Sequence, residues 1–149
     1  MQRQPIKKSI DIQASPEKVW KVLLDDAFNR TWYQHFSEGS HAITTWEEGS
    51  KAIFKDNSGM GMISKVISNK PYTLLAVEYT GILTPAGEED YNSKEAQKVK
   101  GGREAYTLTG DNGSTRLAIS SDMDEAYFDQ MSAAWDKALA NIKSLAESL

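Results

Sequence analysis

The sequence predicts an α+β fold in which an antiparallel sheet packs against one long helix at the C-terminal end. From residue 124 to residue 149, apolar residues recur every three or four positions, which is the spacing of one helix face. Between residues 40 and 121, apolar and polar residues alternate as they do in half-buried strands. With 149 residues, 40% of them hydrophobic, we expect a single domain over residues 1–149 with a buried core.

The chain opens with a predicted strand and one or two short helices. Ile6, Ile10 and Ile12 alternate with polar residues, so one face of the strand is expected to be buried. A helix is expected at Ser15-Pro16, because Ser can cap a helix and Pro suits its first position. Its apolar stripe is Val19, Trp20, Leu23 and Leu24. Residues 25–36 predict either a second short helix or an irregular turn.

Residues 40–80 predict four strands separated by tight turns. The strands are expected at residues 42–46, through residues 52–54, and at 60–67 and 73–80, with turn-forming residues between them. In the last of these strands Leu75, Val77 and Tyr79 share one face. Glu78 lies on the opposite face, so its meaning depends on which face is buried.

Residues 83–102 follow no clear period and predict either a long loop or a loop that holds a short helix near residues 93–99. Loops of this length often cover a functional site. The next two strands, residues 103–109 and 114–121, are expected to form a hairpin around Asp111-Asn112-Gly113. The predicted sheet therefore has about six to seven antiparallel strands.

The C-terminal helix is the longest predicted element, because no Pro or Gly interrupts residues 124–149. At about 1.5 Å per residue it would be roughly 35 to 40 Å long, enough to cross a small domain. Its apolar face consists of Tyr127, Phe128, Met131, Ala134, Trp135, Ala138, Leu139, Ile142, Leu145, Ala146 and Leu149. This face either packs directly on the sheet or encloses a ligand cavity with it.

Composition excludes several classes of protein. The net charge of −4 without a block of Lys and Arg argues against a nucleic-acid partner. The absence of Cys excludes disulfides, thiolate nucleophiles and Cys-based metal sites. No apolar run approaches the ~20 residues of a membrane span, and residues 1–8 lack the apolar core of a signal peptide. We therefore expect a soluble cytoplasmic protein without a membrane span.

Several motifs carry a family resemblance in the order of the chain. They are the opening strand with Ala14-Ser15-Pro16-Glu17-Lys18-Val19-Trp20, then Trp32, Trp46-Glu47-Glu48-Gly49, Gly61-Met62-Ile63-Ser64-Lys65-Val66 with Pro71 and Leu74, Gly113-Ser114-Thr115-Arg116-Leu117, and Trp135, Leu139 and Lys143. The sequence resembles the Bet v 1-like or START-like (SRPBCC) superfamily, and within it the group named after the activator of the Hsp90 ATPase. The resemblance covers nearly the whole chain except residues 83–102.

The resemblance implies the helix-grip fold, a curved antiparallel sheet around the long C-terminal helix with a hydrophobic pocket between them. It implies no fixed activity, because this fold hosts lipid carriers, hormone receptors, cyclases and co-chaperone domains. Aromatic and Met side chains make adaptable apolar walls, and Tyr or Trp adds a polar group. The candidate lining residues are Trp32, Phe36, Trp46, Phe54, Tyr79, Tyr106, Phe128, Met131 and Trp135. The alternative is that most of them form a solid core.

Signals for catalysis or metal binding are few. His35 and His41 are the only histidines, and their spacing is not that of a metal pair on a helix face. The acidic residues 88–90 are expected to be a solvated loop. The sequence has no nucleophile-elbow motif and no phosphate-binding Gly loop. We therefore predict no catalytic residue, no metal ligand and no cofactor.

Three functions remain open at this point. The first is a non-enzymatic protein that holds a small hydrophobic molecule in the cavity. The second is a protein-interaction domain related to the Hsp90 ATPase activator, with a chaperone as partner. The third is a cyclase, dehydratase or hydrolase that acts inside the cavity. A ligand-binding protein should be stabilised by apolar ligands. An interaction domain should expose a contiguous apolar patch. An enzyme should have a titratable group with a shifted pKa inside the cavity. The sequence names neither the ligand nor the oligomeric state.

Overall fold

Over residues 3–149, which the computed structural model describes, the chain forms one antiparallel sheet of eight strands. The sheet order is β1-β8-β7-β5-β4-β3-β2, and the short β6 pairs with β5. The strands are β1 (Arg3–Ile12), β2 (His41–Ile43), β3 (Lys51–Lys55), β4 (Gly61–Lys70), β5 (Leu74–Leu83), β6 (Glu89–Asp90), β7 (Arg103–Asp111) and β8 (Ser114–Asp124). The helices are α1 (Pro16–Leu24), α2 (Asp26–Tyr33), α3 (Lys94–Val99) and α4 (Phe128–Glu147), with a 3₁₀ turn, η1, at Glu125–Tyr127.

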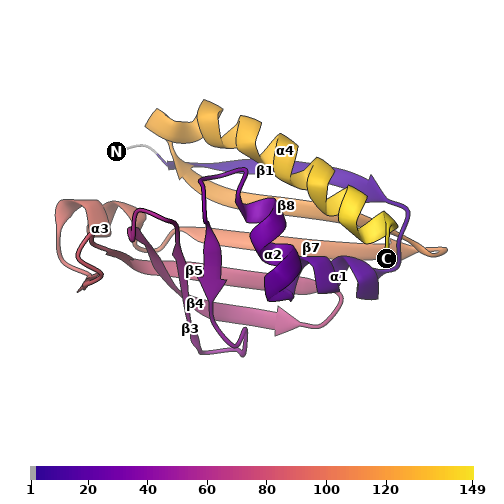
Figure 1. The fold of residues 1–149 in the computed structure, drawn as a ribbon, viewed down its shortest axis with the longest axis horizontal. Helices are drawn as coiled ribbons and strands as arrows, with labels where there is room; N and C mark the ends of the chain where they lie inside the picture. Colours follow the sequence, from indigo (N-terminus) through magenta and orange to yellow (C-terminus); the bar gives the residue numbers. More distant parts are fainter. Residues whose placement is uncertain (1–2) are drawn as a thin grey trace.

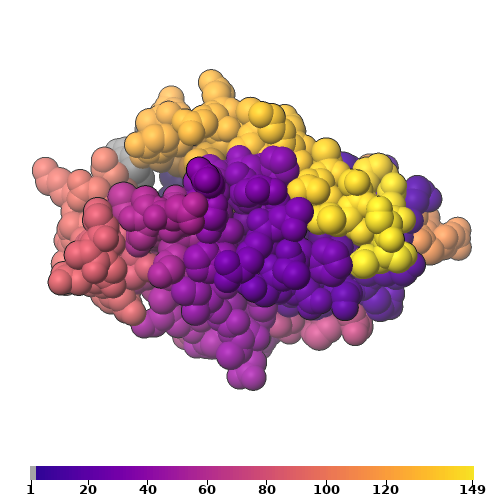
Figure 2. Space-filling model, viewed as in Figure 1, coloured from indigo at the N-terminus to yellow at the C-terminus, as the bar shows by residue number. Residues whose placement is uncertain are grey.

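The helices α1, α2 and α4 lie together on one face of the sheet (Figure 1). The long helix α4 packs on β1, α1 and α2, while α3 lies against β5 at the far end of the molecule. Figure 2 shows this face closed over by α1, α2 and α4, with α3 and its neighbours at one end. This is the predicted helix-grip arrangement, and both short helices after the first strand are present. No helix of the described residues combines the length and the hydropathy needed to cross a membrane.

Helix α4 buries a narrower face than the sequence predicts. The buried residues follow helical spacing and are Trp135, Ala138, Leu139, Ile142 and Ala146. The two ends of the predicted stripe are exposed, with Tyr127 56% and Leu149 42% accessible. Tyr127 belongs to η1 rather than to α4, because the Asp124 side chain accepts a hydrogen bond from the Ala126 amide (3.0 Å) and begins the turn there.

Two other segments refine the predicted boundaries. The strand expected at residues 42–46 ends at Ile43, and Trp46 has φ +64°, outside the extended region of a strand. Within residues 83–102 the short helix is present as α3, where the Ser93 hydroxyl accepts from the Ala96 amide at 3.1 Å. Ala96 is fully buried. The loop with a short helix is therefore the correct alternative for this segment.

The concave face of the sheet is set by the register of its central strands. Val77 of β5 pairs with Glu104 of β7, and Glu104 pairs with Ser121 of β8. Directly paired residues point to the same face. Since Val77 is buried under the helices, Glu104 and Ser121 face the interior as well. The same alternation sends Glu78 to the outer face, where it forms an ion pair with Arg103 at 3.0 Å.

Candidate ligand-binding cavity

A cavity of about 270 Å³ lies between the concave face of the sheet and the helices α2 and α4. Its walls are mainly aromatic and Met side chains. Of the nine predicted lining residues it brings together Trp32, Phe36, Phe54, Tyr79, Tyr106, Met131 and Trp135. Trp32 donates its indole hydrogen to the Val22 carbonyl (3.0 Å), so its polar atom is satisfied and its ring faces the other aromatic residues.

Trp46 and Phe128 lie outside this lining. Trp46 is partly buried and packs against the lining residue Phe54, with ring centroids 6.2 Å apart. Phe128 is partly buried at the first turn of α4 and packs against the core. Hydrophobicity marks both as interior residues, but which layer of the interior they occupy depends on how the elements pack.

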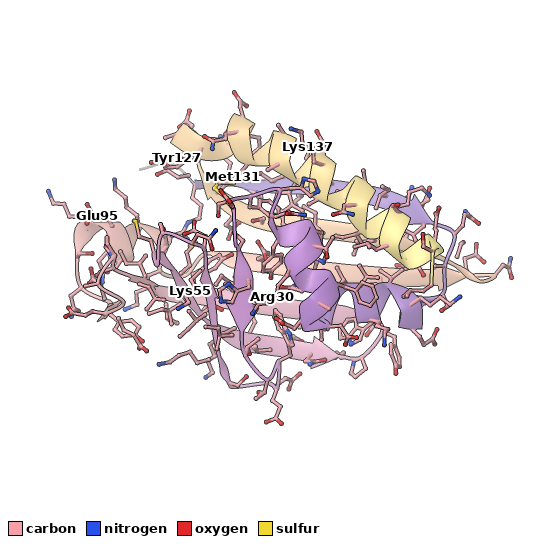
Figure 3. The ribbon with its side chains drawn as sticks, in the orientation of Figure 1. Arg30, Lys55, Glu95, Tyr127, Met131 and Lys137 are labelled. Carbon is pink, nitrogen blue, oxygen red and sulfur yellow. The ribbon has the colours of Figure 1, made fainter. Side chains whose placement is uncertain are left out.

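A second hollow of about 820 Å³ adjoins the first and forms its mouth. The two share Asp56, Met60, Gly61, Met62, Tyr79, Met123 and Met131 as lining residues. The outer walls come from α3, from the end of β5 and from η1, including Glu95, Leu83 and Tyr127. Figure 3 shows Met131 on the sheet side of α4 near this opening, with Glu95 across from it on α3. The segment of residues 83–102 therefore forms one side of the mouth.

The polar centre of the cavity is Glu104, which was not among the predicted site residues. Three hydroxyl groups converge on its carboxylate. Tyr106 donates to Oε2 at 2.7 Å, while Ser121 and Tyr79 donate to Oε1 at 3.2 Å and 3.3 Å. These residues come from β7, β8 and β5, so three strands build one hydrogen-bonded cluster, which we call the Glu104 cluster.

The surroundings of the Glu104 cluster change its acid–base behaviour. Burial raises the pKa of Glu104, and the hydrogen bonds from Tyr106, Ser121 and Tyr79 offset this only in part. Burial, together with the nearby Glu104 charge, raises the pKa of Tyr79 and of Tyr106 well above the ordinary value. Tyr33, another lining residue, has its pKa raised mainly by burial. The tyrosines therefore stay neutral hydrogen-bond donors, and the carboxyl group is the acidic group of the cluster.

A signal for Glu104 is present in the sequence. It precedes Tyr106 and Leu108 by two and four positions, so it is in phase with the buried residues of its strand. Ser121 is likewise in phase with Leu117 and Ile119 of β8. A charged residue on the apolar face of a strand is unusual and marks a candidate site.

The two histidines and Glu89 make contacts outside the Glu104 cluster. His35 contacts Asn141 (3.2 Å), and His41 contacts the Gly39 carbonyl (2.9 Å). Glu89 pairs with Lys51 on the surface at 2.9 Å. Across residues 3–149, no three His, Cys, Asp or Glu side chains are grouped so that they could hold a metal ion.

The fold is similar to that of several solved structures. The Aha1 dimer from Colwellia psychrerythraea matches with a TM-score of 0.72 at 19% identity, over 97% of this chain and 96% of that one. MLL2253 from Mesorhizobium loti matches with a TM-score of 0.74 at 13% identity, over 97% and 98% of the two chains. DynU16, a protein of the dynemicin biosynthetic locus, matches with a TM-score of 0.69 at 17% identity, over 96% of this chain and 47% of that one.

At these identities the likeness is one of fold, and it agrees with the superfamily resemblance carried by the sequence motifs. The sequence matches no protein-family model and no curated protein.

Proposed function

We propose that this protein binds a small hydrophobic molecule in the cavity between the sheet and α4. The observation that carries the proposal is a hollow of about 270 Å³ with aromatic and Met walls that adjoins a wider mouth. Ligand pockets typically measure about 300–1,000 Å³ and combine apolar walls with a few placed polar groups. The wider hollow falls within this range, the inner one lies just below it, and the Glu104 cluster supplies the polar groups.

Access to the cavity is expected to pass Met131. Its side chain lines both hollows and is partly buried, so a larger side chain there would fill the passage without cutting into the solid core. Lys137 of the same helix points away from the sheet (Figure 3). The two positions therefore give a matched pair, one inside the passage and one on the solvent side.

The test is titration with the neutral fluorophore N-phenyl-1-naphthylamine, whose emission rises in an apolar site. We expect saturable binding to the wild type, at least about tenfold weaker binding to Met131→Trp, and unchanged binding to Lys137→Trp; tenfold corresponds to about 1.4 kcal/mol. Circular dichroism of both variants is the control for correct folding. Absence of saturable binding to the wild type, or equal binding to both variants, contradicts the proposal.

Two other functions stay predictions. Catalysis inside the cavity is favoured by the convergence of Glu104 with two tyrosines, because these groups can transfer protons. The test is to incubate a bound molecule with the wild type and with Glu104→Gln and to analyse the released molecule. Catalysis predicts that the wild type changes it chemically and that Glu104→Gln binds it but leaves it unchanged.

A chaperone partner is supported by the similarity of fold to the Aha1 dimer. Its test is co-sedimentation with a purified chaperone.

A further inference from the structure

We propose that the cavity selects hydrophobic molecules that carry a positively charged amine, and that the Glu104 carboxylate binds this amine. The inference rests on the proposed binding function and names the chemical class of its ligand. The hydrogen bonds of the Glu104 cluster, the charges around it and the aromatic rings beside it support this ligand class.

The hydrogen bonds favour a carboxylate as the acceptor at this position. Tyr79, Tyr106 and Ser121 each direct a hydroxyl group at Glu104, and each has Glu104 as its side-chain hydrogen-bond partner. An ionised carboxylate accepts hydrogen bonds at both oxygens and can use all three donors at once, whereas a protonated one must itself donate. The three hydroxyl groups can thus stabilise a negative charge at this position.

Among residues 3–149 the carboxyl group of Glu104 has no positively charged partner, because no Lys, Arg or His of this range forms an ion pair with it. Lys55 and His41 are the basic residues of the inner lining, and neither makes a hydrogen bond to Glu104. Burial of a charge is costly unless it is paired, so a cation delivered by a ligand would supply the missing partner.

The walls beside Glu104 suit the same ligand. The rings of Phe54, Tyr79, Tyr106 and Trp135 line the cavity with Glu104. Phe54 and Tyr79 have centroids 6.4 Å apart, and Tyr106 and Trp135 lie 5.9 Å apart. Aromatic faces attract ammonium groups and also bury the hydrocarbon part of an amphiphilic amine. A carboxylate ligand would instead meet the charge of Glu104 at close range.

The test compares three molecules on one skeleton: phenylbutylamine, phenylbutanol and phenylbutyrate. Binding is measured by displacement of N-phenyl-1-naphthylamine. For the wild type we expect the amine to bind about tenfold or more tightly than the alcohol, because hydrogen bonds between charged groups are stronger than those between neutral groups, and the acid to bind most weakly. For Glu104→Gln we expect the amine to lose this advantage while the alcohol still binds.

Acidic residues at the mouth could also attract an amine, so Glu95→Gln is the control. Glu95 is exposed on α3, and its replacement is expected to leave the preference unchanged. The preference should also persist at high salt, because a buried pair is screened much less than surface charges are. Equal binding of amine and alcohol to the wild type, or a preference that survives Glu104→Gln, overturns the inference. Failure of all three molecules and of the fluorophore to bind overturns the binding function itself.

Discussion

At the scale of single residues, Glu104 is expected to make the stability of the protein depend on pH. Its pKa is raised in the folded protein from the ordinary value of 4.5, mainly by burial. Below that ordinary value the group is protonated in both states and does not oppose folding. As the pH rises through the raised pKa, the folded protein must ionise a partly buried group, so stability is lost.

We therefore expect the free energy of unfolding of the wild type, relative to Glu104→Gln, to fall as the pH rises from below 4.5 through the raised pKa of Glu104. Tyr79 and Tyr106 do not contribute in this range, because their pKa values lie above the ordinary value. Urea denaturation of both proteins across this range measures the difference. Glu78→Gln on the outer face is the matched control, and a pH dependence of the same size there would contradict the assignment to Glu104.

At the scale of elements, α4 is held to the sheet by a small number of fully buried side chains. Trp135 is 2% exposed, and its ring contacts Trp32, Phe36 and Tyr106 with centroid distances of 6.2, 4.9 and 5.9 Å. It is the largest buried residue of α4 and also part of the cavity wall. Its contacts therefore join α2, α4 and β7.

Replacing Trp135 with Ala is expected to lower the free energy of unfolding by roughly 3–5 kcal/mol, because a large buried ring is lost and a hollow is left. Tyr127→Ala is the control from the same end of the chain, since that ring is 56% exposed. Its effect is expected within about 0.5 kcal/mol. Urea unfolding measures both values, and a loss below about 1 kcal/mol for Trp135→Ala would place that residue outside the stabilising core.

At the scale of the whole molecule, ligand binding and folding are expected to be coupled. The cavity is formed jointly by the sheet and by α2 and α4, so it exists only in the folded chain. A ligand present at 100 times its Kd then raises the free energy of unfolding by about 2.7 kcal/mol. We expect the melting temperature to rise steadily with the concentration of N-phenyl-1-naphthylamine. Met131→Trp should show a smaller rise, and a melting temperature independent of ligand in the wild type would exclude this coupling.

The sequence alone determined the elements that depend on local rules. The helical spacing from Trp135 to Ala146 predicted α4, and Asp111-Asn112-Gly113 predicted the hairpin, where Asn112 and Gly113 have φ +51° and +83°. Alternation predicted that Glu78 lies on the face of β5 opposite Leu75, Val77 and Tyr79, and the structure shows that this is the outer face. These predictions succeed because period and turn chemistry act between residues close in the chain.

The tertiary structure decided what the cavity contains. Tyr79, Glu104 and Ser121 meet because β5, β7 and β8 are neighbours in the sheet, although 25 and 17 positions separate Glu104 from the other two. Trp46 and Phe128 are aromatic like the lining residues, but they lie outside the lining. Whether an aromatic side chain reaches the cavity depends on how the elements pack together. The alternation of residues along a strand determines which face of the sheet a side chain is on. The pairing of strands that are distant in the sequence determines which side chains it contacts.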